Sequence, residues 1–352
     1  MKVAIRVDAS QWIGSGHVMR CLVLANACRR SDIEVIFICR QLSGNLISKI
    51  KDSGYEVKPL TAPKKIQVPK SSADYSAWLS VDEVVDAQET IEVANCVDWV
   101  VVDHYGLSSL WESVIKDTLS CSILAIDDLN REHVAQVVLD QNLWPDMEAR
   151  YSSSRALKLL GPEYALLRNS FSELRQSQTD KKEQILVFFG GSDPTGECLK
   201  LLEAVLSFDS LPFTLIVVTG ELNPQYDSLK AMPFHPNVRV VKFINDFDVE
   251  LAKSKYVIGA SGVSNWERFC LRVPASVVAV ADNQVELSEF LGEKGFVRYL
   301  GEGVHTSKSI YITELELLRQ AWLDLSGVND QLQVDGFGAD RVVGELLRFD
   351  NE

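Results

Sequence analysis

The stretch RVDASQWIGSGHVMRC, residues 6–21, places His17 directly after Gly14 and Gly16. The two glycines permit a tight turn and let a ligand approach the backbone closely. An apolar run over 3–7 predicts a strand before this turn, and the spacing of Val18, Cys21, Leu22 and Ala25 predicts a helix from about residue 16. The free N–H groups at a helix N-terminus can bind an anion. Their partial positive charge disfavours an imidazolium, and a neutral ring is what a general base requires. His17 is therefore either a catalytic base or a structural residue at a helix start.

The glycine spacing does not match two common phosphate-binding motifs. The dinucleotide fingerprint G-x-G-x-x-G would need a third glycine at position 19, which is Met19, and an acidic residue closing the second strand, which ends at Arg40. No Gly-Lys-Ser/Thr follows, so the loop is not a P-loop either.

Two further strand ends, in VVVDHYG (100–106) and LAIDDL (124–129), carry polar side chains. These side chains are Asp103, His104, Tyr105, Asp127 and Asp128. They could form a polar cluster that faces a ligand, or they could satisfy backbone amides of their loops. A third interpretation is a Mg²⁺ site built from the carboxylates.

The second half of the chain repeats the strand–glycine turn–helix pattern twice, in VFFGGSDPTGE (187–197) and YVIGASGVSNWERF (256–269). In the first turn, Asp193 and Pro194 predict a helix start, with the aspartate as N-cap and the proline at the first helical position. Small residues let backbone amides reach phosphate oxygens, and Glu267 could accept two hydrogen bonds from a ribose diol. The candidate phosphate-binding residues are Gly190, Gly191, Ser192, Ser261, Gly262, Ser264 and Asn265.

Alternating apolar runs and helical stretches predict an α/β protein with two doubly wound, Rossmann-like domains. Strands are expected in the first domain at 3–7, 35–39, 98–103, 122–127 and 137–140, and in the second at 185–191, 213–220, 238–243, 256–260 and 275–281. We predict a first domain over 1–168, a polar linker over 169–184 and a second domain over 185–352, whose last helix could pack back on the first domain. Ligands of such sheets bind beyond the carboxyl ends of the strands, so a cleft between the domains is the expected site. Segment 61–80 is polar and is expected to be an irregular surface excursion.

Composition excludes several classes of protein. The 352 residues carry a net charge of −14 and no basic run, which argues against a nucleic-acid partner. Seven cysteines without a C-x-x-C pair favour reduced thiols in the cytoplasm over zinc or disulfide frameworks. A signal peptide and a membrane span are not expected. The oligomeric state is not predicted.

Several motifs together resemble one family. The opening stretch resembles the R-x-D-x-S-x-x-I-G-x-G-H-x-x-R signature of the UDP-2,4-diacetamido-2,4,6-trideoxy-β-L-altropyranose hydrolase family of pseudaminic acid biosynthesis. Further motifs follow in the family's order over about residues 1–300: DHYG, IDDL, LDQN, LLGPEYALLR, GGSDP, S-x-x-x-W-E and DNQ (282–284). The resemblance implies a fold of the GT-B glycosyltransferase type, like that of the peptidoglycan N-acetylglucosaminyltransferase.

The resemblance also implies roles for individual residues. The histidine of G-x-G-H maps onto His17 as the catalytic base, and the nucleotide site maps onto the turns 190–193 and 261–267. The expected reaction is attack of water on the anomeric carbon, with inversion, to give free sugar and UDP. No cofactor or metal is implied. Additional sugar or water contacts are expected from Asp8, Ser10, Tyr105, Asn283 and Gln284, beside Gly14 and Gly16.

Two other functions remain open. An inverting glycosyltransferase of the same fold would place an acceptor where the hydrolase places water. A sensor protein would bind the nucleotide sugar without turnover.

Overall fold

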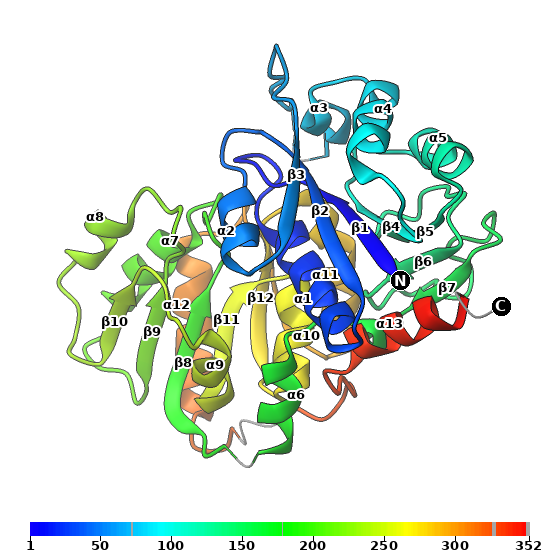
Figure 1. Ribbon diagram of the computed structural model, residues 1–352. Helices are drawn as coiled ribbons and strands as arrows, with labels where there is room; N and C mark the ends of the chain where they lie inside the picture. Colours follow the sequence, from blue (N-terminus) through cyan, green and yellow to red (C-terminus); the bar gives the residue numbers. More distant parts are fainter. Residues whose placement is uncertain (72, 178, 326–328, 350–352) are drawn as a thin grey trace. The chain divides into compact units, whose positions relative to one another are not determined.

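The computed structural model describes residues 1–71, 73–177, 179–325 and 329–349 (Figure 1). The chain forms two compact units, unit 1 from residues 1–168 with 337–352 and unit 2 from residues 169–336. Each unit is built around one sheet whose strands pair in parallel. The predicted fold class, two doubly wound α/β domains, is confirmed.

Unit 1 contains a seven-stranded sheet in the order β3-β2-β1-β4-β5-β6-β7. Side chains of alternate residues of β1 enter different hydrophobic clusters, Val3 and Ile5 on one face and Ala4 on the other, so both faces are covered. The strands are β1 (Lys2–Val7), β2 (Glu34–Arg40), β3 (Glu56–Leu60), β4 (Trp99–Asp103), β5 (Ser122–Ile126), β6 (Val137–Asp140) and β7 (Leu157–Leu160).

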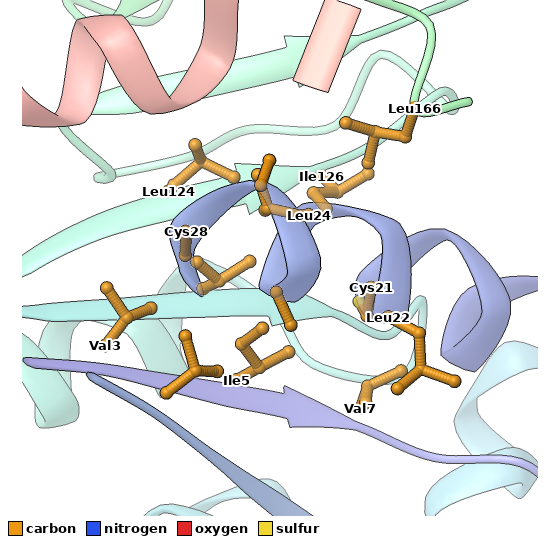
Figure 2. Close-up of a cluster of buried hydrophobic side chains, with 14 of the residues drawn as sticks. Val3, Ile5, Val7, Cys21, Leu22, Leu24, Cys28, Leu124, Ile126 and Leu166 are labelled. Carbon is orange, nitrogen blue, oxygen red and sulfur yellow. The ribbon is translucent and has the colours of Figure 1, made fainter. Parts of the chain in front are cut away.

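The helix α1 (Gly16–Arg30) packs its apolar stripe on β1 and β5 (Figure 2). Cys21, Leu24 and Cys28 are fully buried there, at the three- and four-residue spacing of one helix face. Basic side chains in the last turn complement the helix dipole. The other helices of unit 1 are α2 (Ile47–Asp52), α3 (Tyr75–Leu79), α4 (Glu83–Ala94), α5 (Ser109–Leu119), the 3₁₀ turn η1 (Pro162–Tyr164) and α13 (Gly338–Phe349).

The strand order of unit 1 reverses between β1 and β4, which are neighbours in the sheet although far apart in the chain. Their register aligns Val7 with Asp103, so the residues that follow β1 and the end of β4 emerge side by side. Such a switch point leaves room for a ligand beyond the strand ends. His17 and Asp103 both belong to this edge of the sheet.

Unit 2 contains a six-stranded sheet in the order β10-β9-β8-β11-β12-β13. Its switch point lies between β8 and β11, and these two strands lead into the two predicted glycine turns. The strands are β8 (Lys182–Phe188), β9 (Thr214–Val218), β10 (Val238–Val241), β11 (Ser254–Ala260), β12 (Ala275–Ala279) and β13 (Arg298–Glu302). The helices are α6 (Asn169–Gln176), α7 (Glu197–Val205), α8 (Tyr226–Lys230), α9 (Phe247–Lys253), α10 (Val263–Cys270), η2 (Asp282–Gln284), α11 (Val285–Glu293) and α12 (Lys308–Ala321).

Local structure departs from the sequence expectations at a few segments. The stretch 169–184, expected as a linker, holds α6 and the first residues of β8. Phe171 of α6 is fully buried and anchors this helix. The helix α13 belongs to unit 1, where its buried residues join the cluster around α1. Within segment 61–80, Tyr75–Leu79 forms α3 rather than irregular chain.

A helix that spans a bilayer needs about 20 consecutive, mostly apolar residues. Among the described residues, no helix is both long enough and apolar enough to cross a bilayer.

Candidate active site

The loop between β1 and α1 forms a turn that its own hydrogen bonds hold in place. The hydroxyl oxygen of Ser10 accepts hydrogen bonds from the backbone N–H groups of Trp12 and Ile13, each at 3.1 Å. Gly14, which pairs with Ser10, has φ +77°, a conformation that favours glycine. Nothing lies within 4 Å of the position that a Cβ would take at Gly14 or Gly16, so the turn is open to an approaching ligand. Ser10 itself shapes the turn, and its contact with substrate stays a prediction.

Asp103, at the end of β4, binds His17 and Arg20 at the same time. Its Oδ1 lies 2.6 Å from Nδ1 of His17 and accepts a hydrogen bond from Nη2 of Arg20 at 2.6 Å. Its Oδ2 accepts a second bond from Nε of Arg20, also at 2.6 Å. His17 and Arg20 stand three residues apart on α1, the spacing that places two side chains on one helix face.

This contact determines which nitrogen of His17 carries the proton. A lone pair on Nδ1 would face a carboxylate oxygen at 2.6 Å, so Nδ1 donates to Asp103, and the neutral ring keeps its lone pair on Nε2. Nη2 of Arg20 lies farther from Nδ1, at 3.2 Å. Among the described residues no group hydrogen-bonds to Nε2, which retains some solvent exposure. The arrangement presents Nε2 as a proton acceptor.

The charge of Asp103 is strongly stabilised. Burial by itself raises the pKa of Asp103, but the charge of Arg20, followed by that of His17, outweighs burial and holds the pKa far below its usual range. Asp103 is therefore a carboxylate at neutral pH. It can orient the imidazole and stabilise the imidazolium that forms when His17 accepts a proton.

A second buried ion network lies under the loop that follows β1. Asp8 accepts a hydrogen bond from Nη2 of Arg6 at 2.8 Å and another from the backbone N–H of Arg40 at 2.7 Å. Asp86 of α4 binds the guanidinium groups of both arginines. Asp8 is 1% exposed, so on this geometry it braces the loop, and its contact with a sugar stays a prediction.

Aromatic side chains surround the imidazole. The ring centroid of Tyr105 lies 4.7 Å from that of His17, and the centroid of Trp78 lies 6.0 Å away, both in edge-to-face orientation. The hydroxyl of Tyr105 donates to Oδ1 of Asp128 at 2.6 Å. Burial, followed by the charge of Asp128, raises the pKa of Tyr105 well above its usual value, so the phenol stays protonated. Tyr105 thus lies against the ring of His17, and its contact with a sugar or water stays a prediction.

The three carboxylates considered for a metal site bind separate partners. Asp103 pairs with Arg20, Asp127 pairs with Arg131 at 2.6 Å, and Asp128 accepts the bond from Tyr105. Within the described part of the chain, no group of three His, Cys, Asp or Glu side chains is arranged to hold a metal ion. The structure thus places these aspartates in hydrogen-bonded pairs.

His133 lies between two acidic side chains of the same region. Its Nδ1 lies 2.6 Å from Oε1 of Glu112, and its Nε2 lies 3.6 Å from Oδ2 of Asp127. Burial lowers the pKa of His133, but its close contacts with the carboxylates of Asp127 and Glu112 outweigh burial and raise the pKa to about 9. His133 is therefore a buried cation at neutral pH.

In unit 2, the backbone of the glycine turn after β8 has free space beside it at both glycines. Gly190 has φ +93°, and nothing lies within 4 Å of a Cβ position at Gly190 or Gly191. Ser192 is exposed beside them. These three residues follow β8 at the switch point, and the binding of an anion by their backbone amides stays a prediction.

The helix that follows this turn begins later than predicted. Asp193 and Pro194 do not start it: α7 begins at Glu197, after a turn in which the N–H of Gly196 donates to the carbonyl of Asp193. The Asp193 carboxylate still accepts the N–H groups of Glu197 and Cys198, at 2.8 and 2.9 Å. Because a protein carboxylate already occupies these amides, they are not free to bind a phosphate.

The turn between β11 and α10 has no such side-chain cap. Gly262, with φ +102°, precedes α10, and no side chain caps the helix. The N–H of Asn265 donates to the carbonyl of Gly262 at 2.9 Å, so the N–H groups of Val263 and Ser264 are the ones that could meet an anion. The buried side chain of Asn265 donates to the hydroxyl of Ser261 at 2.9 Å and braces the turn from below. Ser264 and Glu267 are half-buried on the first turns of the helix.

The segment η2 lies against the same turn. Nε2 of Gln284 is 3.5 Å from the position that a Cβ would take at Gly262, while Oε1 accepts the N–H of Val280 at 3.0 Å. Asn283 is exposed on η2. The structure therefore brings Gln284 to the Ser261–Gly262 turn, and the contacts of Asn283 and Gln284 with a ligand stay predictions.

Sequence reasoning missed three side chains of these sites. Arg20 closes the R-x-D-x-S-x-x-I-G-x-G-H-x-x-R signature, but its pairing with Asp103, like that of His17, depends on the register of β1 and β4, which short motifs do not reveal. Trp78 lies in a segment that was expected to be irregular. Arg268 directly follows Glu267, and its burial on α10 could not be read from the sequence.

The buried His133 makes stability depend on pH. Its folded pKa of about 9 exceeds the unfolded value of about 6.5, so the folded state binds more protons between these values. The contribution is fully present below about pH 6.5 and is lost as the pH rises through 9, up to about 3 kcal/mol. We expect the free energy of urea unfolding to fall over this range.

The control for this prediction is a second histidine. His133→Gln should flatten the pH dependence above about 6.5, whereas replacement of the exposed His305 should leave it unchanged. A native-like slope in the His133 variant would contradict the assignment.

Comparison with known proteins gives relatives in sequence and in fold. No family model matches the chain. The chain is 28% identical over 309 residues to the UDP-2,4-diacetamido-2,4,6-trideoxy-β-L-altropyranose hydrolase of Campylobacter jejuni, an alignment that spans 84% of this chain and 98% of the hydrolase. It is 24% identical over 263 residues to the spore coat polysaccharide biosynthesis protein SpsG of Bacillus subtilis, over 71% of this chain and 76% of SpsG.

A solved structure extends the likeness to the fold. The MurG structure from Acinetobacter baumannii superposes with a TM-score of 0.65 at 16% identity and covers 99% of both chains. The predicted resemblance is confirmed: the chain has a GT-B fold like that of MurG and is related in sequence, over most of its length, to the UDP-sugar hydrolase of Campylobacter jejuni.

Proposed function

We propose that the protein hydrolyses a UDP-linked 2,4-diacetamido-2,4,6-trideoxy sugar to the free sugar and UDP, as a step of pseudaminic acid biosynthesis. The observation that carries the proposal is the contact of His17 with Asp103, which leaves Nε2 of His17 as an accessible base. The name of the Campylobacter relative supports the choice of substrate.

In the proposed reaction, Nε2 of His17 takes a proton from water as the water oxygen attacks the anomeric carbon. The bond from this carbon to the diphosphate oxygen breaks, and its electron pair leaves with UDP. Attack on the face opposite UDP inverts the anomeric configuration. Asp103 keeps the ring oriented and balances the positive charge that His17 gains.

Unit 2 is proposed to hold the nucleotide. The amides of Gly190 and Gly191 and the uncapped start of α10 would bind the diphosphate, and Glu267 would bind the ribose. Fixed amide dipoles stabilise the negative charge that grows on the leaving diphosphate. UDP is already a good leaving group, so the proposal requires no strong general acid.

The fate of an isotopic label tests which bond breaks. In ¹⁸O-water, the label should enter C1 of the released sugar and be absent from UDP, as read by NMR and mass spectrometry. Label in the phosphate would contradict attack at carbon. Release of UDP only when a sugar acceptor is added would favour a glycosyltransferase, and UDP binding without any turnover would favour a sensor.

The base assignment predicts a loss of rate without a loss of fold. His17→Asn keeps an amide that can donate to Asp103 but has no basic nitrogen near neutral pH. We expect kcat to fall at least about a hundredfold, because general base catalysis contributes about 10²–10⁴ in rate. The melting temperature should stay within a few degrees, and UDP affinity should be nearly unchanged.

A neighbouring variant serves as the control. Met19 is exposed two residues along the same helix, and Met19→Ala should keep kcat within about threefold of the native value. A folded His17→Asn protein with similarly native turnover would show that His17 is only structural.

A further inference from the structure

Arg268 is a buried cation directly beneath the Ser261–Gly262 turn. Its side chain comes from α10 and is 3% exposed. Nη2 donates to the carbonyl of Ala260 at 3.0 Å and to the amide oxygen of Asn265. Nη1 lies 3.4 Å from the position that a Cβ would take at Gly259. The guanidinium therefore fills the space behind the residues that lead from β11 into α10.

The charge of Arg268 has no carboxylate to balance it at close range. Within the described residues, no acidic oxygen lies within 4.0 Å of the guanidinium, and Nε, although buried, has no hydrogen-bond partner. Burial lowers the pKa of Arg268 to about 10, and the nearby charge of Glu267 opposes this shift only in part. Arg268 therefore remains protonated at neutral pH.

Within the described part of the chain, the other buried arginines are paired with carboxylates. Arg6 binds Asp8 and Asp86, Arg20 binds Asp103, Arg40 binds Asp86 and Arg150 binds Asp140. An isolated buried charge costs several kcal/mol, and natural folds usually balance it with a partner of opposite sign. The unbalanced cation lies in unit 2, behind the uncapped helix start at which the proposed function places a diphosphate.

We propose that Arg268 is a positioning residue for the diphosphate. The buried guanidinium attracts the negative charge of the diphosphate electrostatically across the Ser261–Gly262 turn, without touching it. The inference rests on the proposed function, since it takes the anion to be the diphosphate of a nucleotide sugar. Fixed positive charge in a low-dielectric setting favours an anion more strongly than the same charge in water. The contribution should grow with the number of phosphate groups on the ligand.

Calorimetric titration with uridine, UMP and UDP tests this dependence on charge. Arg268→Gln should bind uridine within about twofold of the native protein, UMP more weakly, and UDP at least about tenfold more weakly. Arg268→Lys keeps the charge and should recover most of the UDP affinity. Arg272→Gln is the matched control, because Arg272 is exposed and pairs with Asp330, and it should leave all three affinities unchanged.

Other outcomes distinguish a failure of the Arg268 proposal from a failure of the proposed function. An equal loss for all three ligands, or no loss for UDP, would overturn the role of the Arg268 charge. An Arg268→Gln protein that fails to fold would overturn it too, because the guanidinium would then be needed for the turn itself. If the native protein does not bind UDP, the proposed function is wrong.

Discussion

The buried carboxylate of Asp103 connects the sheet of unit 1 to the chemistry proposed for it. It ends β4, accepts two hydrogen bonds from Arg20 and fixes the proton of His17 on Nδ1. A buried charge of this kind is stable only with its partners in place. The β1–β4 register and the start of α1 must therefore form together before Nδ1 of His17 can donate to Asp103.

The protein carries a strong negative charge overall, yet the proposed ligand is an anion. The structure resolves this conflict locally. In unit 2, open glycine turns and an uncapped helix start offer N–H groups, while Arg268 adds a positive charge behind them. At the start of α7, by contrast, the Asp193 carboxylate already accepts hydrogen bonds from the first N–H groups of the helix. The difference between the two helix starts favours the β11–α10 turn as the phosphate site.

Much of the fold could be predicted from the sequence, because central strands read as continuous apolar runs. The edge strands β3, β7 and β13 were missed, since their half-exposed residues give no such run. The start of α7 was misplaced because Asp193 bonds to the helix amides from within a preceding turn rather than from the N-cap position.

The sequence indicated which residues could belong to the candidate site, but not which of their side chains bind one another. His17 and Tyr105 could be named because strand ends and glycine turns mark a switch point. That Asp103 would hold His17 through Nδ1, with Arg20 beside it, depends on a strand register of long sequence separation. Trp78 reaches the imidazole from a segment without periodicity, so no sequence pattern indicated it.

The central claim is that Asp103 keeps the proton of neutral His17 on Nδ1 and leaves Nε2 free. The ¹⁵N chemical shifts of the ring nitrogens of His17, measured in the native protein and in Asp103→Asn, test this most directly. We predict a protonated Nδ1 and an unprotonated Nε2 in the native protein, and a mixture of tautomers in the variant. A native ring with its proton on Nε2 would contradict the account, because that nitrogen could not then accept a proton from water.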